Sequence, residues 1–158
     1  MIFRLLEETD REMLLSMAKA YYREDGNIYG LPRIEQALDA LLSGEEFARL
    51  WVIEHCAKSV GYLCITFGFS LEAGGREFFI DEIYLKPEFR NQGIGTKAIE
   101  FAENESRKLG ARRIVLETEK TNLKAKKLYE KIGFELHQRH LMSKFLLLKP
   151  EIQNHDRL

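Results

Sequence analysis

The chain has 158 residues, of which 45% are hydrophobic and 31% are charged. This length suits one soluble domain with a sizeable core, and we expect a single domain over residues 1–149 with a frayed tail over residues 150–158. The 24 basic residues nearly cancel the 25 acidic residues. The chain therefore lacks the excess of basic residues that would indicate a nucleic-acid or membrane partner.

Targeting signals and metal sites find no support in the sequence. The apolar runs are too short to cross a bilayer, and acidic residues follow the first few apolar ones, unlike in a signal peptide. We therefore expect a cytoplasmic protein. Two cysteines and four histidines form no zinc-binding spacing, so no metal is expected. Cys64 lies in an apolar strand pattern and is interpreted as a small buried residue.

The N-terminal third predicts a strand over residues 1–7 followed by two helices. Thr9 begins the first helix, and Glu12 completes a capping box three residues later. A polar loop follows that helix. The second helix has Pro32 in its first turn and ends at Gly44, residues typical of these two positions.

The middle of the chain predicts an antiparallel meander. Strands over residues 50–53, 60–69 and 78–85 are joined by short turns. A helix then begins near Ile94 and stops at Gly110, which favours a left-handed C-terminal turn.

The last third predicts a further strand, a helix and a final hairpin. The strand covers residues 113–117, and the helix begins at Asn122 and ends at Gly133. Residues 134–137 and 141–148 are interpreted as the two strands of the hairpin. We expect the strand–helix–strand unit in the middle of the chain to be parallel, with a right-handed crossover. The predicted class is α/β, with a mixed sheet and about four helices.

The loop Arg90-Asn91-Gln92-Gly93-Ile94-Gly95 separates a strand from a helix. Glycine allows a tight turn and lets a ligand approach the main chain. The free N–H groups and the dipole at a helix start favour an anion, typically a phosphate. The same glycines are equally compatible with a helix start that is simply tight.

Two known phosphate-binding motifs, the P-loop and the dinucleotide-binding loop, are alternative interpretations of this segment. A P-loop is excluded because a lysine and then Ser or Thr would have to follow Gly95, whereas Thr96-Lys97 follows. Residues 93–98 fit the dinucleotide pattern G-x-G-x-x-A, with Glu117 about twenty residues on. Against that pattern, seven residues separate Leu85 from the first glycine, and the remaining chain is too short for a dinucleotide domain.

A second motif follows the glycine loop. Arg90, Gly93 and Gly95 form the pattern R-x-x-G-x-G, and the strand Ile114-Val115-Leu116-Glu117 follows it. The chain then continues as Asn122-x-x-Ala125-x-x-x-Tyr129-x-x-x-Gly133-Phe134. Together these segments resemble motifs A and B of the GNAT superfamily of N-acetyltransferases. The strand–helix–helix opening matches as well, so the resemblance covers essentially the whole domain.

The resemblance implies that acetyl-CoA binds between two splayed parallel strands, residues 79–85 and 113–117. Main-chain N–H groups of residues 92–96 would hold the pyrophosphate. Main-chain groups of two strand residues would pair with the pantetheine, and Asn122 would add a side-chain contact besides capping its helix. Asn91 stands where many members have glycine, but Asn tolerates positive φ. The implied cofactor-binding residues are Ile83, Leu85, Arg90, Asn91, Gln92, Gly93, Ile94, Gly95, Thr96 and Asn122.

The implied reaction is direct attack of a primary amine on the thioester in a ternary complex, and we expect the amine to belong to a small cationic molecule. The amine must be neutral, so a base must take its proton. Asp81 and Glu82 end the strand beside the thioester. Because strand residues alternate, we expect only one to face the acceptor and favour Glu82. The alternative interpretation is that both are ordinary carboxylates, either solvated or ion-paired.

The resemblance also implies that Tyr129 protonates the leaving thiolate. The alternative is that Tyr129 is a tyrosine of the hydrophobic core.

The resemblance also implies an acceptor site that includes Tyr22, Glu24, Asp25 and Tyr29. Acidic and aromatic groups suit a cationic amine, although the same residues also suit a polar loop. Residues 80–84 look like those of polyamine acetyltransferases, but many GNAT proteins share them, so the acceptor stays open. A homodimer is possible. An alternative function on the same fold is a non-catalytic acetyl-CoA sensor or partner-binding module.

Overall fold

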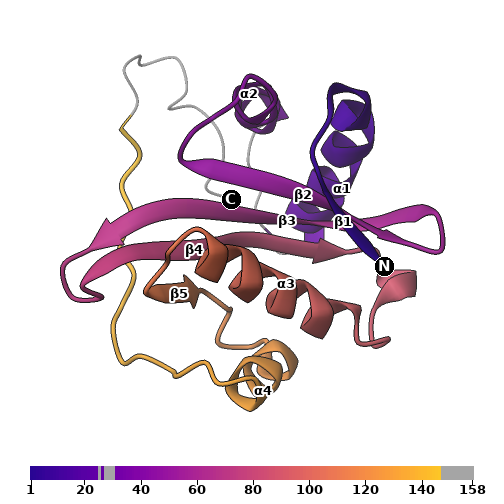
Figure 1. Ribbon diagram of the computed structural model, residues 1–158. Helices are drawn as coiled ribbons and strands as arrows, with labels where there is room; N and C mark the ends of the chain where they lie inside the picture. The colour runs from indigo at the N-terminus through magenta and orange to yellow at the C-terminus, as the bar shows by residue number, and fades with distance from the viewer. Residues whose placement is uncertain (25, 27–30, 147–158) are drawn as a thin grey trace.

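The computed structural model describes residues 1–24, 26 and 31–146. Within this part of the chain, five strands form one sheet in the order β1-β2-β3-β4-β5 (Figure 1). The strands are β1 (Ile2–Leu5), β2 (Ala48–His55), β3 (Lys58–Ser70), β4 (Gly75–Leu85) and β5 (Arg113–Leu116). The helices are α1 (Arg11–Glu24), α2 (Leu31–Leu42), α3 (Ile94–Lys108) and α4 (Leu123–Lys131), with short 3₁₀ turns η1 (Glu8–Asp10) and η2 (Pro87–Phe89).

The sheet combines two kinds of pairing. Strands β1 to β4 pair antiparallel with their neighbours, whereas β5 pairs parallel with β4. The parallel pair is connected through α3, as expected for a strand–helix–strand unit. The predicted mixed α/β sheet is therefore confirmed.

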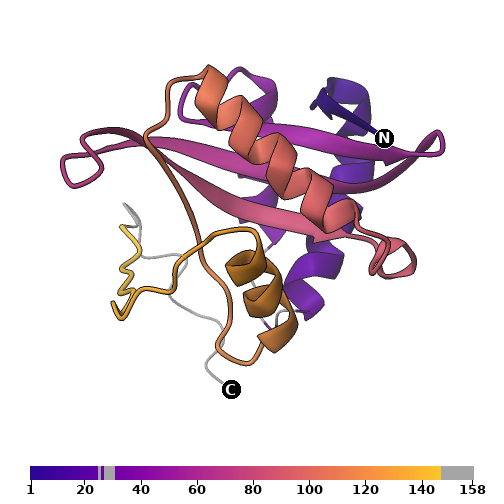
Figure 2. The same ribbon diagram turned by 60° about the horizontal axis from the view of Figure 1, so that its bottom comes forward.

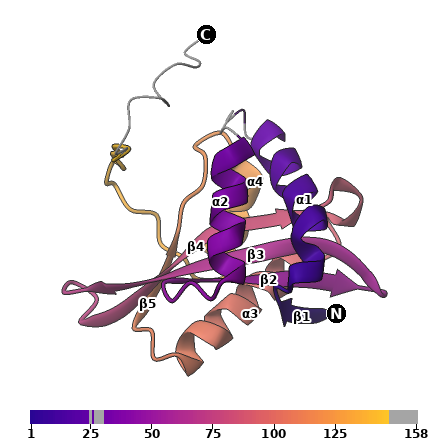
Figure 3. The same cartoon turned by 90° about the horizontal axis from the view of Figure 1, so that it is seen from above.

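Helices cover both faces of the sheet. Helices α1 and α2 lie side by side across one face (Figure 3), and α3 crosses the other (Figure 2). Strand β3 shows how the sequence supplies both cores: Tyr62 and Cys64 join the cluster beneath α1 and α2, while Leu63 and Ile65 join the cluster beneath α3. Successive strand side chains point to opposite faces, so a strand covered on both faces is apolar at nearly every position.

A β-bulge interrupts this alternation in β4. Phe78 and Ile80 pack in the cluster beneath α3, but Tyr84, also an even-numbered residue, packs in the cluster beneath α1 and α2. In the register with β3, Cys64 opposes Glu82 while the next residue along β3 already opposes Ile80. Asp81 is therefore the extra residue, and side chains after it change face.

Strands β4 and β5 separate beyond the bulge. Their parallel register ends where Ile80 opposes Leu116, yet β4 continues to Leu85. Residues 81–85 therefore have β3 on one side and no paired strand on the other in the described chain. The pairing between β4 and the edge strand β5 is therefore lost over this stretch.

The two predicted N-terminal helix caps have different outcomes. The capping box lies two residues earlier than expected: Asp10 accepts from the backbone N–H of Glu7 at 3.0 Å, in place of the predicted pair Thr9 and Glu12. Asp10 also accepts two hydrogen bonds from Arg4, at 2.6 and 2.8 Å, and this pairing selects the earlier position. At α4 the predicted cap is confirmed, because Asn122 Oδ1 accepts from the backbone N–H of the third helical residue at 3.1 Å.

The prediction of a final hairpin is wrong over residues 134–146, because these residues contain no strand. β5 is only four residues long, so it provides a short edge for further pairing. Side-chain contacts hold the segment instead: Arg139 donates to Glu72 at 2.9 and 3.0 Å, and the ring of Phe145 lies under Arg33. The expected tail, residues 150–158, lies outside the described residues.

Candidate active site

A pocket of about 260 Å³ lies between α1, α2 and the central strands. Its volume is slightly below the usual range for drug-sized ligands, which favours a small occupant. A larger hollow of about 340 Å³ near the end of β1 contains none of the predicted site residues. The smaller pocket is lined by Leu14, Ala18, Tyr22, Arg33, Ile34, Ala37, Leu38, Leu41, Leu50, Tyr62, Cys64, Asp81, Glu82 and Phe145.

Both carboxylates of the bulge line this pocket. The alternation of strand side chains predicts that Asp81 and Glu82 face opposite sides of the sheet, whereas both line the same pocket. Before the bulge, odd-numbered residues of β4 face α1 and α2, and after it even-numbered residues do. A bulge places two adjacent residues on one face, which the alternation rule does not anticipate.

Two tyrosines hold Glu82. Tyr22 donates a hydrogen bond to Oε1, and Tyr62, only 1% exposed, donates to Oε2 at 2.8 Å. Burial, followed by the negative charge of Glu82, raises the pKa of both phenols. The two hydroxyl groups therefore stay protonated and continue to donate at neutral pH.

Asp81 has a different environment. The residue keeps part of its surface exposed, but surrounding protein removes enough water from the carboxyl group to raise its pKa. Asp81 has no hydrogen-bond or ion-pair partner in the described chain. The pKa of Glu117, just beyond β5, is also raised, first by burial and then by the charge of Asp81. These two carboxyl groups therefore lie near enough to influence each other, just beyond the last paired residues of β4 and β5.

The loop before α3 presents its main chain to solvent. Gly93 is the N-cap with φ 76°, and no described side chain caps the helix there. Asn91 also has positive φ, at 63°, as glycine would. A Cβ added at Gly93 would meet no atom within 4 Å, and one at Gly95 would meet only Leu85, at 3.9 Å. The N–H groups of the first turn lack intrahelical acceptors, and a helix start of this kind favours an anion such as a diphosphate.

The side chains of this loop bind the protein itself. Arg90 donates to the Leu85 carbonyl at 2.8 Å and to Glu24 at 2.7 Å. Gln92 donates to the carbonyl of residue 88 at 2.9 Å, and Asn91 accepts from a lysine of α4. Main-chain groups are thus left to contact a ligand. Glu24 does not line the pocket, and its predicted place beside the acceptor stays a prediction.

Tyr129 does not line the pocket. Its half-buried ring packs against the cluster beneath α3, as do Ile83 and Leu116 from the two strands that separate. The ring centroid is 5.9 Å from that of Phe134, and burial raises the pKa of the phenol. A core contact is therefore present, and it does not preclude a catalytic role.

The sequence profile of the Acetyltransferase (GNAT) family matches residues 11–134. The chain belongs to this family. The uncharacterized N-acetyltransferase YhfO of Bacillus subtilis (strain 168) is 27% identical over 77% of this chain and 79% of its own length. The thialysine N-epsilon-acetyltransferase of Bos taurus is 35% identical, over 47% of this chain and 43% of its own length.

A solved structure has the same GNAT fold. The integron cassette protein HFX_CASS3, from the mobile metagenome of Cole Harbour salt marsh, superposes with a TM-score of 0.78 and 30% identity. The match covers 92% of this chain and 90% of that protein. The mixed sheet and its covering helices are therefore a fold already observed by experiment.

This GNAT chain brings together only part of the predicted site. Tyr22, Asp81 and Glu82 meet in the pocket, whereas Asp25 and Tyr29 lie outside the described residues. The sequence analysis missed the pocket residues Tyr62, Arg33 and Phe145, and it gave Glu117 no role in the site. Cys64 is buried as predicted, and burial raises the pKa of its thiol.

The described residues contain no group of three His, Cys, Asp or Glu side chains that could hold a metal ion. In the same part of the chain, each helix is too short or too polar to cross a membrane.

Proposed function

We propose that this protein is an acetyl-CoA-dependent N-acetyltransferase that acts on a primary amine of a small molecule through a ternary complex. The observation that carries the proposal is the bulge at Asp81. It places two carboxylates in one pocket at the point where β4 and β5 separate. Carboxylates attract an ammonium group, and a carboxylate with a raised pKa can accept its proton near neutral pH.

The open start of α3 supports the choice of acetyl-CoA. Main-chain N–H groups of Gly93, Ile94, Gly95 and Thr96 would bind the diphosphate. The unpaired edge of β4 at Ile83 would bind the pantetheine. The Leu85 carbonyl already accepts from Arg90, so its N–H is the remaining group at that residue. When bound, acetyl-CoA supplies a thioester carbonyl carbon for the amine to attack.

The two carboxylates of the pocket suit different roles. Glu82, fixed by two phenols, would hold and orient the ammonium form of the substrate. Asp81, whose carboxyl has a raised pKa and no described partner, suits the base better than Glu82, the residue that the sequence favours. Asp81 would take a proton as the C–N bond forms, and the phenol of Tyr129 would supply a proton to the sulfur as the C–S bond breaks.

The test is release of free thiol from acetyl-CoA by the purified protein in the presence of a panel of primary amines, including thialysine. We expect thiol release that depends on an added amine, with an equal amount of N-acetylated product by mass spectrometry. Binding of acetyl-CoA without turnover on any amine would favour the sensor function instead.

A further inference from the structure

The candidate acceptor pocket carries opposite charges on its two walls. Asp81 and Glu82 enter it from β4, whereas Arg33 enters it from α2. Arg33 forms no ion pair with any carboxylate of the described chain. The guanidinium and the two carboxylates are thus separate binding groups within one space.

Arg33 lies against an aromatic ring that also lines the pocket. Its guanidinium carbon lies 4.5 Å from the centroid of the Phe145 ring. Stacking on an aromatic ring uses the flat face of the guanidinium, and the N–H donors lie in the plane. Because these donors form a rigid fork that matches a carboxylate, Arg33 is suited to bind one with two parallel hydrogen bonds.

Apart from Tyr22 and Arg33, the wall that α1 and α2 contribute to the pocket is apolar. Six side chains form it, and none of them carries a polar group. Such a wall favours a hydrocarbon chain over a polar one, because burying polar groups without partners is costly. The six residues are Leu14, Ala18, Ile34, Ala37, Leu38 and Leu41.

We propose that the acceptor is an ω-amino carboxylic acid with an aliphatic chain between its two charged ends. This inference rests on the proposed N-acetyltransferase function and specifies its substrate class. Asp81 and Glu82 bind the amine end, the aliphatic chain lies along α1 and α2, and Arg33 binds the carboxylate. A diamine is disfavoured, because its second ammonium group would meet Arg33 without a partner.

The experiment compares three six-carbon amines at equal ionic strength: 6-aminohexanoate, hexylamine and 1,6-diaminohexane. They share the reacting amine and differ only in whether the far end is anionic, neutral or cationic. The wild-type protein should give the highest kcat/KM with 6-aminohexanoate and the lowest with 1,6-diaminohexane. Arg33→Leu should lower the ratio of kcat/KM for 6-aminohexanoate over hexylamine by about tenfold, mainly through KM. Arg33→Glu should reverse the order of the two charged substrates.

Arg49→Leu provides a matched control. Arg49 also lies over a phenylalanine ring, that of Phe67, at 5.6 Å, but it does not line this pocket. The control should keep the wild-type order of substrates. Equal kcat/KM for 6-aminohexanoate and hexylamine in the wild type, or an unchanged ratio in Arg33→Leu, would overturn the inference and leave the N-acetyltransferase function standing.

If the wild-type protein acetylated no amine, the proposed function would fail, and calorimetry with 6-aminohexanoate would then decide the inference separately. Binding that Arg33→Leu weakens about tenfold would support the two-ended site. Absence of binding, or equal binding to both proteins, would overturn it.

Discussion

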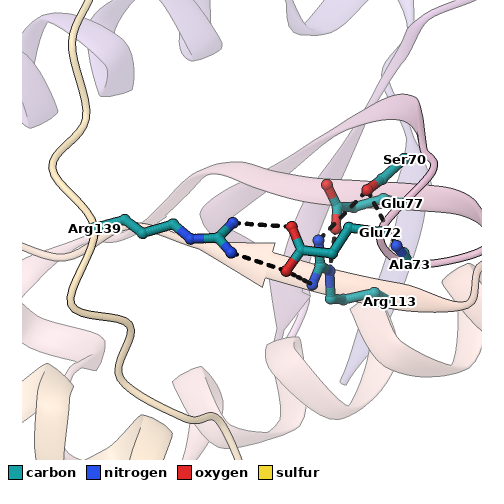
Figure 4. Close-up of polar contacts among 6 residues, drawn as sticks. All are labelled: Ser70, Glu72, Ala73, Glu77, Arg113 and Arg139. Atoms are coloured by element: carbon teal, nitrogen blue, oxygen red, sulfur yellow. Dashed lines mark hydrogen bonds and ion pairs between the residues drawn. The ribbon is translucent and has the colours of Figure 1, made fainter.

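Strand β4 carries carboxylates both where it pairs with β5 and beyond that pairing, in opposite electrostatic environments. Near its start, Glu77 is ion-paired with Arg113 of β5, and the adjoining Glu72 accepts two hydrogen bonds from Arg139 (Figure 4). These contacts lower the pKa of Glu72, chiefly through the hydrogen bonds from Arg139. This end of the sheet ties the β3–β4 turn, β5 and the C-terminal segment together.

Beyond the pairing with β5, the carboxyl groups of Asp81 and of nearby Glu117 have raised pKa values and no basic partner in the described chain. The difference follows from strand pairing. Where β4 and β5 are paired, an arginine of one strand reaches a glutamate of the other. Beyond the last pair the strands separate, and the two carboxyl groups lie just past it. Unpaired carboxyl groups with perturbed pKa values in a cleft mark candidate catalytic groups.

Removing the carboxylate at the open end should have the largest effect. Asp81→Asn keeps the size of the side chain but removes the base, so kcat should fall by about 100-fold or more, the range of general-base catalysis. Glu77→Gln, on the same strand at the paired end, is the control and should keep kcat within a few-fold. Similar losses of kcat in the two variants would remove the functional distinction between the two ends.

The open start of α3 is tested by Gly95→Val. Added methyl groups should displace the diphosphate from the main-chain N–H groups and weaken acetyl-CoA binding about tenfold or more, measured by calorimetry. Gly95 is preferable to Gly93, whose φ of 76° strains any side chain. Unchanged acetyl-CoA affinity in a folded Gly95→Val protein would place the diphosphate elsewhere.

Tyr129→Phe examines the proposed general acid. The change keeps the ring and its packing against Phe134 but removes the hydroxyl. It should leave acetyl-CoA affinity and melting temperature near wild type and lower kcat by about tenfold, as expected for loss of a general acid. A wild-type kcat with chemistry shown to be rate-limiting would leave Tyr129 with a packing role alone.

The two ends should also respond to pH in opposite directions. The pKa of Asp81 is raised above its ordinary value of 3.8, so its contribution to stability falls as the pH rises through the window between the two values. The pKa of Glu72 is lowered from 4.5, so its contribution is complete above 4.5 and is lost as the pH falls through the lowered value. Urea unfolding of wild type, Asp81→Asn and Glu72→Gln across this acidic range would measure both slopes.

The smallest effect is expected from Arg139→Gln. Its ion pair with Glu72 is solvent-exposed, and exposed pairs contribute little to stability. The melting temperature and kcat/KM for the preferred amine should both stay close to wild type. A marked loss of kcat/KM would show that the acceptor pocket needs the contact between Arg139 and Glu72, which holds the segment after α4 against the β3–β4 turn.

Local features of this protein were predictable from the sequence. The glycine loop before α3, the cap at Asn122 and the helix-ending Gly110 depend on the backbone preferences of a few consecutive residues. Gly93 and Gly110 adopt positive φ, and Asn122 accepts the capping hydrogen bond. Two such local motifs in linked order were enough to indicate the family.

The composition of the pocket depended on tertiary structure. The bulge at Asp81 exists only in the pairing of β4 with β3, so the alternation of a single strand could not place both carboxylates on one face. The hydrogen bonds to Glu82 come from Tyr62, 20 residues away, and Tyr22, 60 residues away. Arg33 and Phe145 meet across more than a hundred residues. Contacts between distant segments follow from packing of the whole chain, which local preferences do not encode.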